Sequence, residues 1–302
     1  MKRITMTSLC LCMVLLTQAC KQKTQQTEQE QTGQKQELQL TDRIYTSDED
    51  RAIFENYLSE MKSKKSLPMS QLVTETALYF LGVPYVASTL EKEPEGLVAN
   101  LHEMDCATFV DNVIALSRTI KGENPSFDNY CRNLQHLRYR EGVITDYPSR
   151  LHYTSDWVYV NNQRGIVKDI NGEIGGVSLT FDLNFMSTHP DSYRQLKGNP
   201  ALIDEIVKQE KEINARTTYH FIPKDKIDEY AGKMQSGDMV CFTTAVKGLD
   251  TSHVGFIYWD GDRLTFIHAS SLEMKVTVDK NTLKEYVQKG KNSTGIMLAR
   301  PL

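Results

Sequence analysis

Between Asp105 and Gly122, apolar side chains recur with the three-to-four-residue spacing of one helix face. The recurring positions are Phe109, Val113, Leu116 and Ile120, with Val110 and Ile114 beside them. Asp105 is a favourable N-cap, because its carboxylate can accept hydrogen bonds from the free N–H groups of the first turn. The pattern therefore predicts a helix that begins at Cys106 and ends before Gly122.

Similar spacing elsewhere predicts further helices, and alternation of apolar and polar residues predicts strands. The expected helices are residues 48–64, 70–81, 127–140 and 200–214. The expected strands are residues 177–183, 239–242, 252–259 and 263–270, whereas 165–176 is rich in turns and 186–190 is expected to be a polar loop. Helices that come first and strands that gather in the last third indicate an α+β fold.

The last two expected strands are separated by Asp260-Gly261, a dipeptide typical of a two-residue hairpin loop. Such a loop would place His253 directly opposite His268. Directly opposed side chains share one face of a sheet, with their Cβ atoms about 5 Å apart. The register therefore predicts a histidine pair, and Gly255 on the same face would allow another element to approach closely.

The 302-residue chain is long enough for one large domain or two small ones, and its 40% hydrophobic residues suffice for a packed core. A net charge of -4 and an isoelectric point near 6.0 give no indication of nucleic-acid binding. After the N-terminus, no apolar run is long enough to span a membrane.

The N-terminus has the pattern of a secretory signal, in which a basic start precedes a short apolar stretch at residues 4–16. Residues 16–20 resemble a bacterial lipobox, although Gln18 makes the match imperfect. The expected parts are a lipoprotein signal peptide at 1–20, lipidated at Cys20, and a polar, flexible tether at 21–44. We therefore expect a periplasmic protein that is anchored to a membrane.

Two cysteines would leave with the signal, and lipidation of Cys20 would leave three thiols, Cys106, Cys131 and Cys241. An odd number of thiols in an exported protein argues against a complete disulfide framework and for a functional thiol. A single bridge between Cys131 and Cys241 is left open.

Cys106 is the candidate nucleophile, because the positive end of a helix dipole lowers the pKa of a thiol and favours the thiolate. The alternative is that Cys106 is a small buried apolar side chain, as many free cysteines are. The expected histidine pair favours the functional interpretation, since a thiol hydrolase needs a histidine base and a further polar group that fixes its tautomer. Ordinary strand histidines are the alternative for His253 and His268.

Several segments resemble the NlpC-type superfamily of papain-like cell-wall cysteine hydrolases, and their order along the chain agrees. They are residues 82–85, 105–110, 236–240, 253–258 and 266–270. The resemblance implies that Cys106 is the nucleophile, His253 the general base and His268 the orienting residue. It also implies that Tyr85 and Asp105 lie beside the substrate, and that the cysteine helix packs on an antiparallel sheet in a papain-like core.

The chain differs from compact members of that superfamily in two ways. Ala107-Thr108 stands where Ser-Gly is usual, and the stretch from Cys106 to His253 is far longer. The extra stretch carries residue types suited to sugar and peptide recognition, ahead of residues 187–190. They are Arg150, His152, Ser155, Asp156 and Trp157. These residues resemble a branch of bacterial cysteine-type N-acetylmuramoyl-L-alanine amidases, which implies substrate-binding roles for them. An ordinary amphipathic helix is the alternative for residues 150–157.

That resemblance implies a catalytic domain at residues 45–302, with N-terminal helices and a large mixed insertion at about 140–235. The leading function is hydrolysis of the bond between N-acetylmuramic acid and L-alanine in peptidoglycan or muropeptides, without a cofactor. The closest alternative is an endopeptidase for γ-D-glutamyl–diamino acid bonds, in which Tyr85 and Asp105 hold a free amine. Further alternatives are a non-catalytic wall-binding lipoprotein and a metal site of Cys106 with the two histidines, which a nucleophile at a helix start makes unnecessary.

Overall fold

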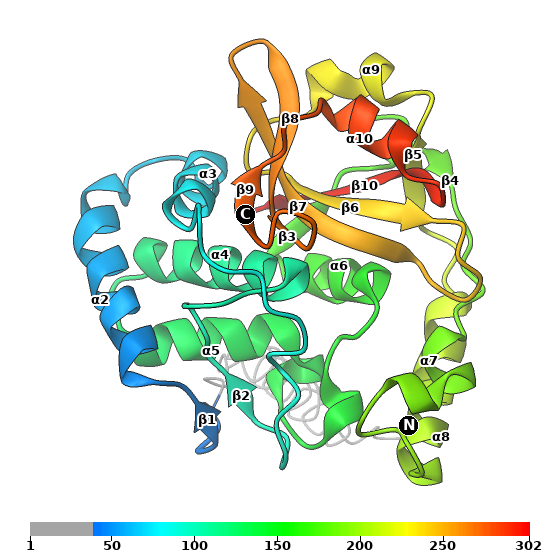
Figure 1. Cartoon of the computed structure of the whole chain (residues 1–302), viewed down its shortest axis with the longest axis horizontal. Helices are drawn as coiled ribbons and strands as arrows, with labels where there is room; N and C mark the ends of the chain where they lie inside the picture. The colour runs from blue at the N-terminus through cyan, green and yellow to red at the C-terminus, as the bar shows by residue number, and fades with distance from the viewer. Residues whose placement is uncertain (1–38) are drawn as a thin grey trace, which may run out of the picture. The chain divides into compact units, whose positions relative to one another are not determined.

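The computed structural model describes residues 39–302, which form an α+β domain as expected (Figure 1). Its helices are α2 (Asp48–Met61), α3 (Met69–Tyr79), α4 (Cys106–Lys121), α5 (Phe127–Arg138), α6 (Thr154–Gln163), α7 (Phe185–Thr188), α8 (Pro200–Asn214), α9 (Ile227–Tyr230) and α10 (Leu283–Lys289). Its strands are β1 (Ile44–Tyr45), β2 (Leu97–Val98), β3 (Val167–Asp169), β4 (Val177–Ser178), β5 (His220–Pro223), β6 (Met239–Thr244), β7 (Thr251–Asp260), β8 (Arg263–Ser270), β9 (Lys275–Val278) and β10 (Ser293–Pro301). Among the described helices, none is long and apolar enough to cross a membrane.

The expected signal peptide and Cys20 lie outside the described residues. The described part of the expected tether, residues 39–44, contacts the domain: Thr41 N donates to Gln135 Oε1 at 2.9 Å, and Leu40 packs against the main apolar cluster. Ile44 pairs in parallel with Leu97 in a small separate sheet. Residues 39–44, expected to be part of the tether, therefore pack with the domain.

Strands β3 to β10 form one antiparallel sheet in the order β4-β5-β10-β6-β7-β8-β9, with β3 also paired to β10. Alternate residues point to opposite faces. Cys241 and Phe256 belong to the apolar cluster that contains α4, whereas Phe242 and Phe266 belong to the cluster that contains α10. Figure 1 shows these two helices on opposite sides of the sheet. Burial of both faces explains the nearly continuous apolar runs in β6 and β8.

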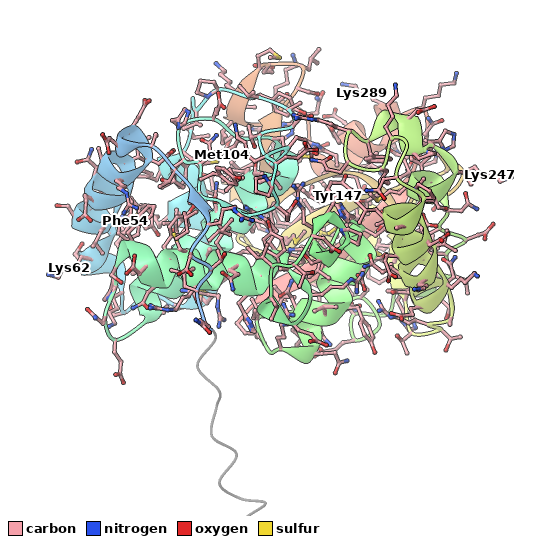
Figure 2. The ribbon with its side chains drawn as sticks, turned by 90° about the horizontal axis from the view of Figure 1, so that it is seen from below. Phe54, Lys62, Met104, Tyr147, Lys247 and Lys289 are labelled. Carbon is pink, nitrogen blue, oxygen red and sulfur yellow. The ribbon has the colours of Figure 1, made fainter. Side chains whose placement is uncertain are left out.

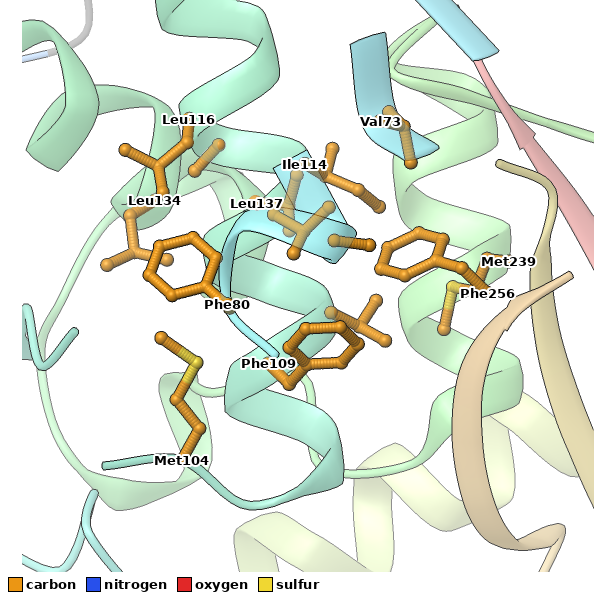
Figure 3. Packing of buried hydrophobic residues seen from close by; sticks show 14 of the residues in the cluster. Val73, Phe80, Met104, Phe109, Ile114, Leu116, Leu134, Leu137, Met239 and Phe256 are labelled. Carbon is orange, nitrogen blue, oxygen red and sulfur yellow. The ribbon is translucent and has the colours of Figure 1, made fainter. Parts of the chain in front are cut away.

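Helix α4 begins and ends where its pattern predicts. Asp105 Oδ1 accepts from Thr108 N at 2.8 Å, and Thr108 Oγ1 accepts from Asp105 N at 2.9 Å, which makes a reciprocal capping box. The Phe109 ring meets the Phe256 ring of β7 edge to face, with centroids 5.8 Å apart (Figure 3). Capping and packing together hold the first turn of α4, and with it Cys106, against the sheet.

The expectations for residues 177–190 are wrong in two places. Only Val177–Ser178 pairs as a strand, because Phe181 and Leu183 leave the sheet and pack in a third apolar cluster around α8. The alternation there reflects burial in that cluster rather than pairing in a sheet. The expected polar loop at 186–190 begins within the short helix α7, which buries Met186 in the same cluster.

The β7–β8 hairpin forms, but its loop lies one position later than expected. Asp260 pairs with Arg263, and Gly261 has a φ of +60° at the first loop position. A glycine at that position is typical of a type II′ turn. The register therefore differs by two residues from the expected one.

The expected direct pairing of His253 with His268 is consequently wrong: continuing the register places Gly255 opposite His268. A Cβ added to Gly255 would lie only 3.1 Å from the His268 Cβ, as the close approach requires. Because strand side chains alternate with a period of two, a shift of two residues keeps both histidines on one face. They are diagonal neighbours rather than direct ones.

The segment at about 140–235, expected to be an insertion, contributes β3, β4 and β5 to the main sheet and also contains α6 and α8. The Cys131–Cys241 bridge left open above is not formed, because Cys106, Cys131 and Cys241 are all free thiols. Cys131 and Cys241 are completely buried in the main apolar cluster.

Candidate active site

Cys106 is the first residue of α4, and its side chain is partly buried against the core. Burial raises the pKa of its thiol to about 12, and the charge of Asp105 adds to the rise, although backbone N–H groups of Val254 and Ala107 favour the thiolate. The expectation that the helix start would lower this pKa is therefore wrong, because loss of hydration outweighs the helix terminus. The thiol needs a nearby base to ionise.

His253 and His268 form a close pair. His253 Nε2 lies 2.6 Å from His268 Nδ1, and the rings are nearly perpendicular with centroids 4.9 Å apart. Burial and the neighbouring His268 lower the pKa of His253 to about 3. Within residues 39–302, no group of three or more His, Cys, Asp or Glu side chains is arranged to hold a metal ion.

Aromatic side chains from three elements surround this histidine pair. Phe242 of β6 lies 5.8 Å from the His253 ring, and Phe266 of β8 lies 4.6 Å from the His268 ring, between centroids. Tyr286 of α10 lies 6.0 Å from His268 and 6.3 Å from His253. These contacts keep water from His268 and restrict rotation of both rings.

Asp279 extends the row formed by His253 and His268, and it was not identified from the sequence as a candidate site residue. Its Oδ2 lies 3.3 Å from His268 Nε2, while its Oδ1 accepts from Asn281 N at 2.8 Å and from Asn281 Nδ2 at 2.9 Å. The residues before it, Lys275–Val278, alternate as a strand, and Thr277 pairs with His268. Recognition of β9 would have placed Asp279 next to His268, because it follows two residues after Thr277 on the same side.

Tyr85 lies close to Cys106 and Asp105. It forms an isolated bridge with Met104, two residues before Cys106. Burial raises the pKa of Tyr85, and the charges of Cys106 and Asp105 raise it further. The structure therefore brings Tyr85, Asp105 and Cys106 together.

A cavity of about 550 Å³ opens beside the start of α4. Its wall comes from segments far apart in the sequence. Lining residues include Ser88, Glu91, Asp105, Ala107, Asp111, Tyr147, Arg150, His152, Trp157, Tyr193, Arg194 and Val254. Ala107 and Val254, the chain neighbours of Cys106 and His253, contribute to this wall. One of these lining residues, Tyr147, is labelled near the middle of Figure 2.

Arg150 and His152 line this cavity, but their polar atoms bind the protein itself. Arg150 Nε and Nη2 donate to the two carboxylate oxygens of Glu95 at 2.7 and 2.8 Å, and Nη1 donates to Glu91 Oε1 at 3.0 Å. His152 Nε2 lies 2.8 Å from Tyr147 O, and burial, followed by the charge of Arg150, lowers the pKa of His152 to about 3. Both side chains shape the cavity wall more than they offer free hydrogen bonds.

Trp157 belongs to a buried network at the base of the cavity. Its Nε1 donates to Asp111 Oδ1 at 3.0 Å, and Arg138 Nε donates to Asp111 Oδ2 at 2.8 Å. Asp111 and Arg138 are 7% and 3% exposed, so the pair is withdrawn from solvent. The indole ring of Trp157 can still present its face to a ligand, although its N–H group is already used.

Ser155 and Asp156 do not line the cavity, which corrects their expected contact with substrate. Both are completely buried. Ser155 N donates to Asp250 Oδ2 at 2.7 Å, and Asp156 is bound by Arg140 and by Arg216, the latter at 2.6 Å. Their polarity serves the internal structure around α6.

The rim of the cavity carries a cation that was not singled out in the sequence. Arg194 is largely exposed, and its nearest acidic partner, Glu93 Oε2, is 3.4 Å away and also exposed. Residues 187–190, noted in the sequence, lie just before this segment, and only Ser192, Tyr193 and Arg194 reach the cavity.

Residues 75–296 match the family described as AmiA-like, N-acetylmuramoyl-L-alanine amidase-like. The chain belongs to this family. The matched range of the AmiA-like family includes Tyr85, Cys106, both histidines and Asp279. The whole candidate site therefore lies within the shared part of the chain.

Solved structures agree with membership in the AmiA-like family. An N-acetylmuramoyl-L-alanine amidase from Bacteroides uniformis is 34% identical with a TM-score of 0.74, over 77% of this chain and 98% of that one. A Bacteroides fragilis protein provisionally named a xylanase is 36% identical with a TM-score of 0.72, over 75% and 99%. A Legionella pneumophila protein at 23% identity and a TM-score of 0.61, over 83% and 96%, shares the fold. No curated protein sequence matches the chain.

Proposed function

We propose that this AmiA-like protein is a cysteine-type amidase that hydrolyses the amide bond between the lactyl group of N-acetylmuramic acid and L-alanine. The observation that carries the proposal is a thiol at a helix start that is hydrogen-bonded to the backbone of Val254, next in the chain to His253, which itself lies 2.6 Å from His268. A large cavity opens beside the same helix start. The family match and the name of the Bacteroides uniformis protein support the choice of bond.

The proposed mechanism starts from neutral groups. With the pKa of Cys106 raised and that of His253 lowered by burial, neither is charged near neutral pH. His253 takes the thiol proton as the sulfur attacks the lactyl carbonyl carbon. Free N–H groups in the first turn of α4, including that of Ala107, are suited to stabilise the oxyanion.

The C–N bond then breaks, and His253 returns the proton to the amine of L-alanine. Water hydrolyses the resulting thioester, with His253 as base, and releases the lactyl carboxylate and the free thiol. The products are free N-acetylmuramic acid and a peptide that begins with L-alanine. This sequence needs no group beyond the thiol, the histidines and the backbone.

The cavity supports a substrate that carries a sugar. Its volume of about 550 Å³ is that of a small-molecule site. Trp157, Tyr147 and Tyr193 supply apolar surfaces for a sugar ring, and Arg194 supplies a cation for an acidic group of the peptide. A site shaped for a sugar and peptide together should act poorly on the peptide alone.

The endopeptidase alternative has one observation in its favour, the closeness of Tyr85 and Asp105 to Cys106. Mass spectrometry of products from N-acetylmuramoyl-L-Ala-D-Glu peptides separates the two functions. We expect free sugar and an intact peptide that starts with L-alanine. Release of L-Ala-D-Glu from the sugar-free peptide, with the sugar-bearing substrate untouched, would establish the endopeptidase instead.

A glycosidase function is not supported for this chain. A glycosidase needs two carboxyl groups that face the scissile bond as acid and as base or nucleophile. Of the acidic residues in the cavity, Asp111 is bound by Arg138 and Glu91 by Arg150. Asp105 is engaged as the cap of α4.

We also propose that the domain has a papain-like NlpC-type core and that Cys20 carries the lipid of a periplasmic lipoprotein. The cysteine helix packed on an antiparallel sheet supports the first statement, and the likeness of residues 16–20 to a lipobox supports the second. Replacement Cys20→Ser should release the protein into the soluble fraction. Wild-type protein recovered there without lipid would contradict the anchor.

A further inference from the structure

Both ring nitrogens of His268 face a polar partner. Nδ1 lies 2.6 Å from His253 Nε2, and Nε2 lies 3.3 Å from Asp279 Oδ2. At that separation Nε2 has no fully formed hydrogen bond to any described residue. The His268 side chain is only 3% exposed, so bulk water does not readily replace a protein partner. Among the residues described, Asp279 is the group placed to pair with this nitrogen.

We propose that Asp279 is a positioning residue that selects the tautomers of both histidines; its catalytic consequence rests on the proposed thiol mechanism. A carboxylate accepts but does not donate, so it favours the proton of His268 on Nε2. Nδ1 of His268 then carries a lone pair, and the 2.6 Å contact needs the proton of His253 on Nε2. His253 consequently keeps its free lone pair on Nδ1, where it can take the thiol proton.

The reverse arrangement would disable the base. If His268 donated through Nδ1, its Nε2 lone pair would face the Asp279 carboxylate, and His253 would carry its proton on Nδ1. Two lone-pair groups 3.3 Å apart in a buried site are unfavourable, since each is left without a donor. The carboxylate at position 279 therefore influences the tautomer of His253 through the intervening ring of His268.

Asp279 is held in the position that this role requires. Asn281 donates to its Oδ1 through both the backbone and the side-chain amide, which leaves Oδ2 toward His268. Although burial raises it, the nearby His268 side chain and the hydrogen bonds from Asn281 lower the pKa of Asp279 overall. The other titratable groups facing the pair are Cys106 of α4 and Tyr286 of α10, whose pKa values burial raises to about 12, so both are neutral.

The Asp279→Asn variant tests the assignment. Asn281 N–H will retain the oxygen of the introduced amide, so its NH₂ group will face His268 Nε2 and impose the reverse tautomers. We expect kcat to fall about 10²-fold or more, by analogy with a wrong tautomer in a catalytic triad, with little change in KM. In ¹⁵N NMR of the substrate-free protein, the protonated nitrogen should change from Nε2 to Nδ1 in both rings.

Two further variants complete the experiment. Asp279→Glu keeps the carboxylate and should retain the wild-type tautomers and part of the activity. Asp262→Asn removes the same charge from the exposed hairpin loop and should change neither tautomers nor kcat. Unchanged tautomers in Asp279→Asn, or a kcat within threefold of wild type, would overturn the assignment. Because the tautomers are measured without substrate, this result is independent of which bond the enzyme cuts.

Discussion

At Gly255 strands β7 and β8 approach closely beside the histidine pair, so Gly255→Ala perturbs the site without changing its chemistry. A Cβ at this position would lie 2.6 Å from Ile267 O and 3.1 Å from His268 Cβ. The first neighbour is backbone and cannot rotate away. Strand β8 must therefore move relative to β7 by several tenths of an ångström.

The movement should affect stability and activity differently. Overpacking in a well-packed core costs typically about 1–3 kcal/mol. The same displacement acts on the 2.6 Å contact between His253 Nε2 and His268 Nδ1. A shift of several tenths of an ångström lengthens and misaligns this hydrogen bond and so weakens it. Weakening of this orienting contact should lower kcat, by less than the roughly 10²–10⁴-fold expected where an orienting residue is lost outright.

Gly261→Ala is a matched control on the same hairpin. No atom lies within 4 Å of its added Cβ, but its φ of +60° makes alanine strained by about 1–2 kcal/mol. Urea unfolding measures both losses in stability, and release of the L-alanyl peptide measures kcat. We expect comparable destabilisation in the two variants and a measurable fall in kcat only in Gly255→Ala. Equal kcat values would refute the argument that this close approach sets the histidine pair.

Three further predictions follow from named groups. Cys106→Ala should abolish hydrolysis while the fold is retained, and near-normal turnover of this variant would exclude Cys106 as the nucleophile. Iodoacetamide should modify Cys106 much faster than the two completely buried cysteines. Asp111→Ala should lower the free energy of unfolding by about 3–5 kcal/mol, because it leaves the buried Arg138 charge unpaired; a loss below 1 kcal/mol would contradict this. Burial lowers the pKa of His152 and of His253 to about 3, so the unfolded chain binds more protons below about pH 6.5, and stability should fall as pH decreases. From pH 7 to pH 5 each histidine should contribute a loss of about 2 kcal/mol, measured by urea unfolding with His152→Gln as a check on one share.

Much of the fold was predictable because its elements have strong local patterns. Helix α4 has an N-cap, an uninterrupted apolar stripe and a terminal glycine, and all three were read correctly. Strand β4 was overpredicted because alternation at 177–183 also arises when residues pack into a separate cluster. Strands β5, β9 and β10 were missed, since two of them are short and their pairing partners are distant in the sequence.

The two histidines lie together, as predicted, although the predicted register was wrong. Period-two alternation constrains the face of a side chain more strongly than its exact partner, so a shift of two residues left both rings together. The pKa of Cys106 was predicted in the wrong direction for a different reason. A helix terminus is visible in the sequence, but the depth of burial that opposes it depends on how α4 packs on the sheet.

The observed partners of residues in the long segment between Cys106 and Val240 change the role inferred for these residues. Arg150 and Asp156 look like recognition groups in the sequence, yet their charges are neutralised by acidic and basic side chains of this chain itself. Because such buried pairs are costly to disrupt, these residues are suited to fixing the shape of a cavity rather than to exchanging partners with a ligand. Selectivity for a sugar-bearing substrate should then depend on the form of the wall and on the few groups that remain available, above all Arg194 at the rim.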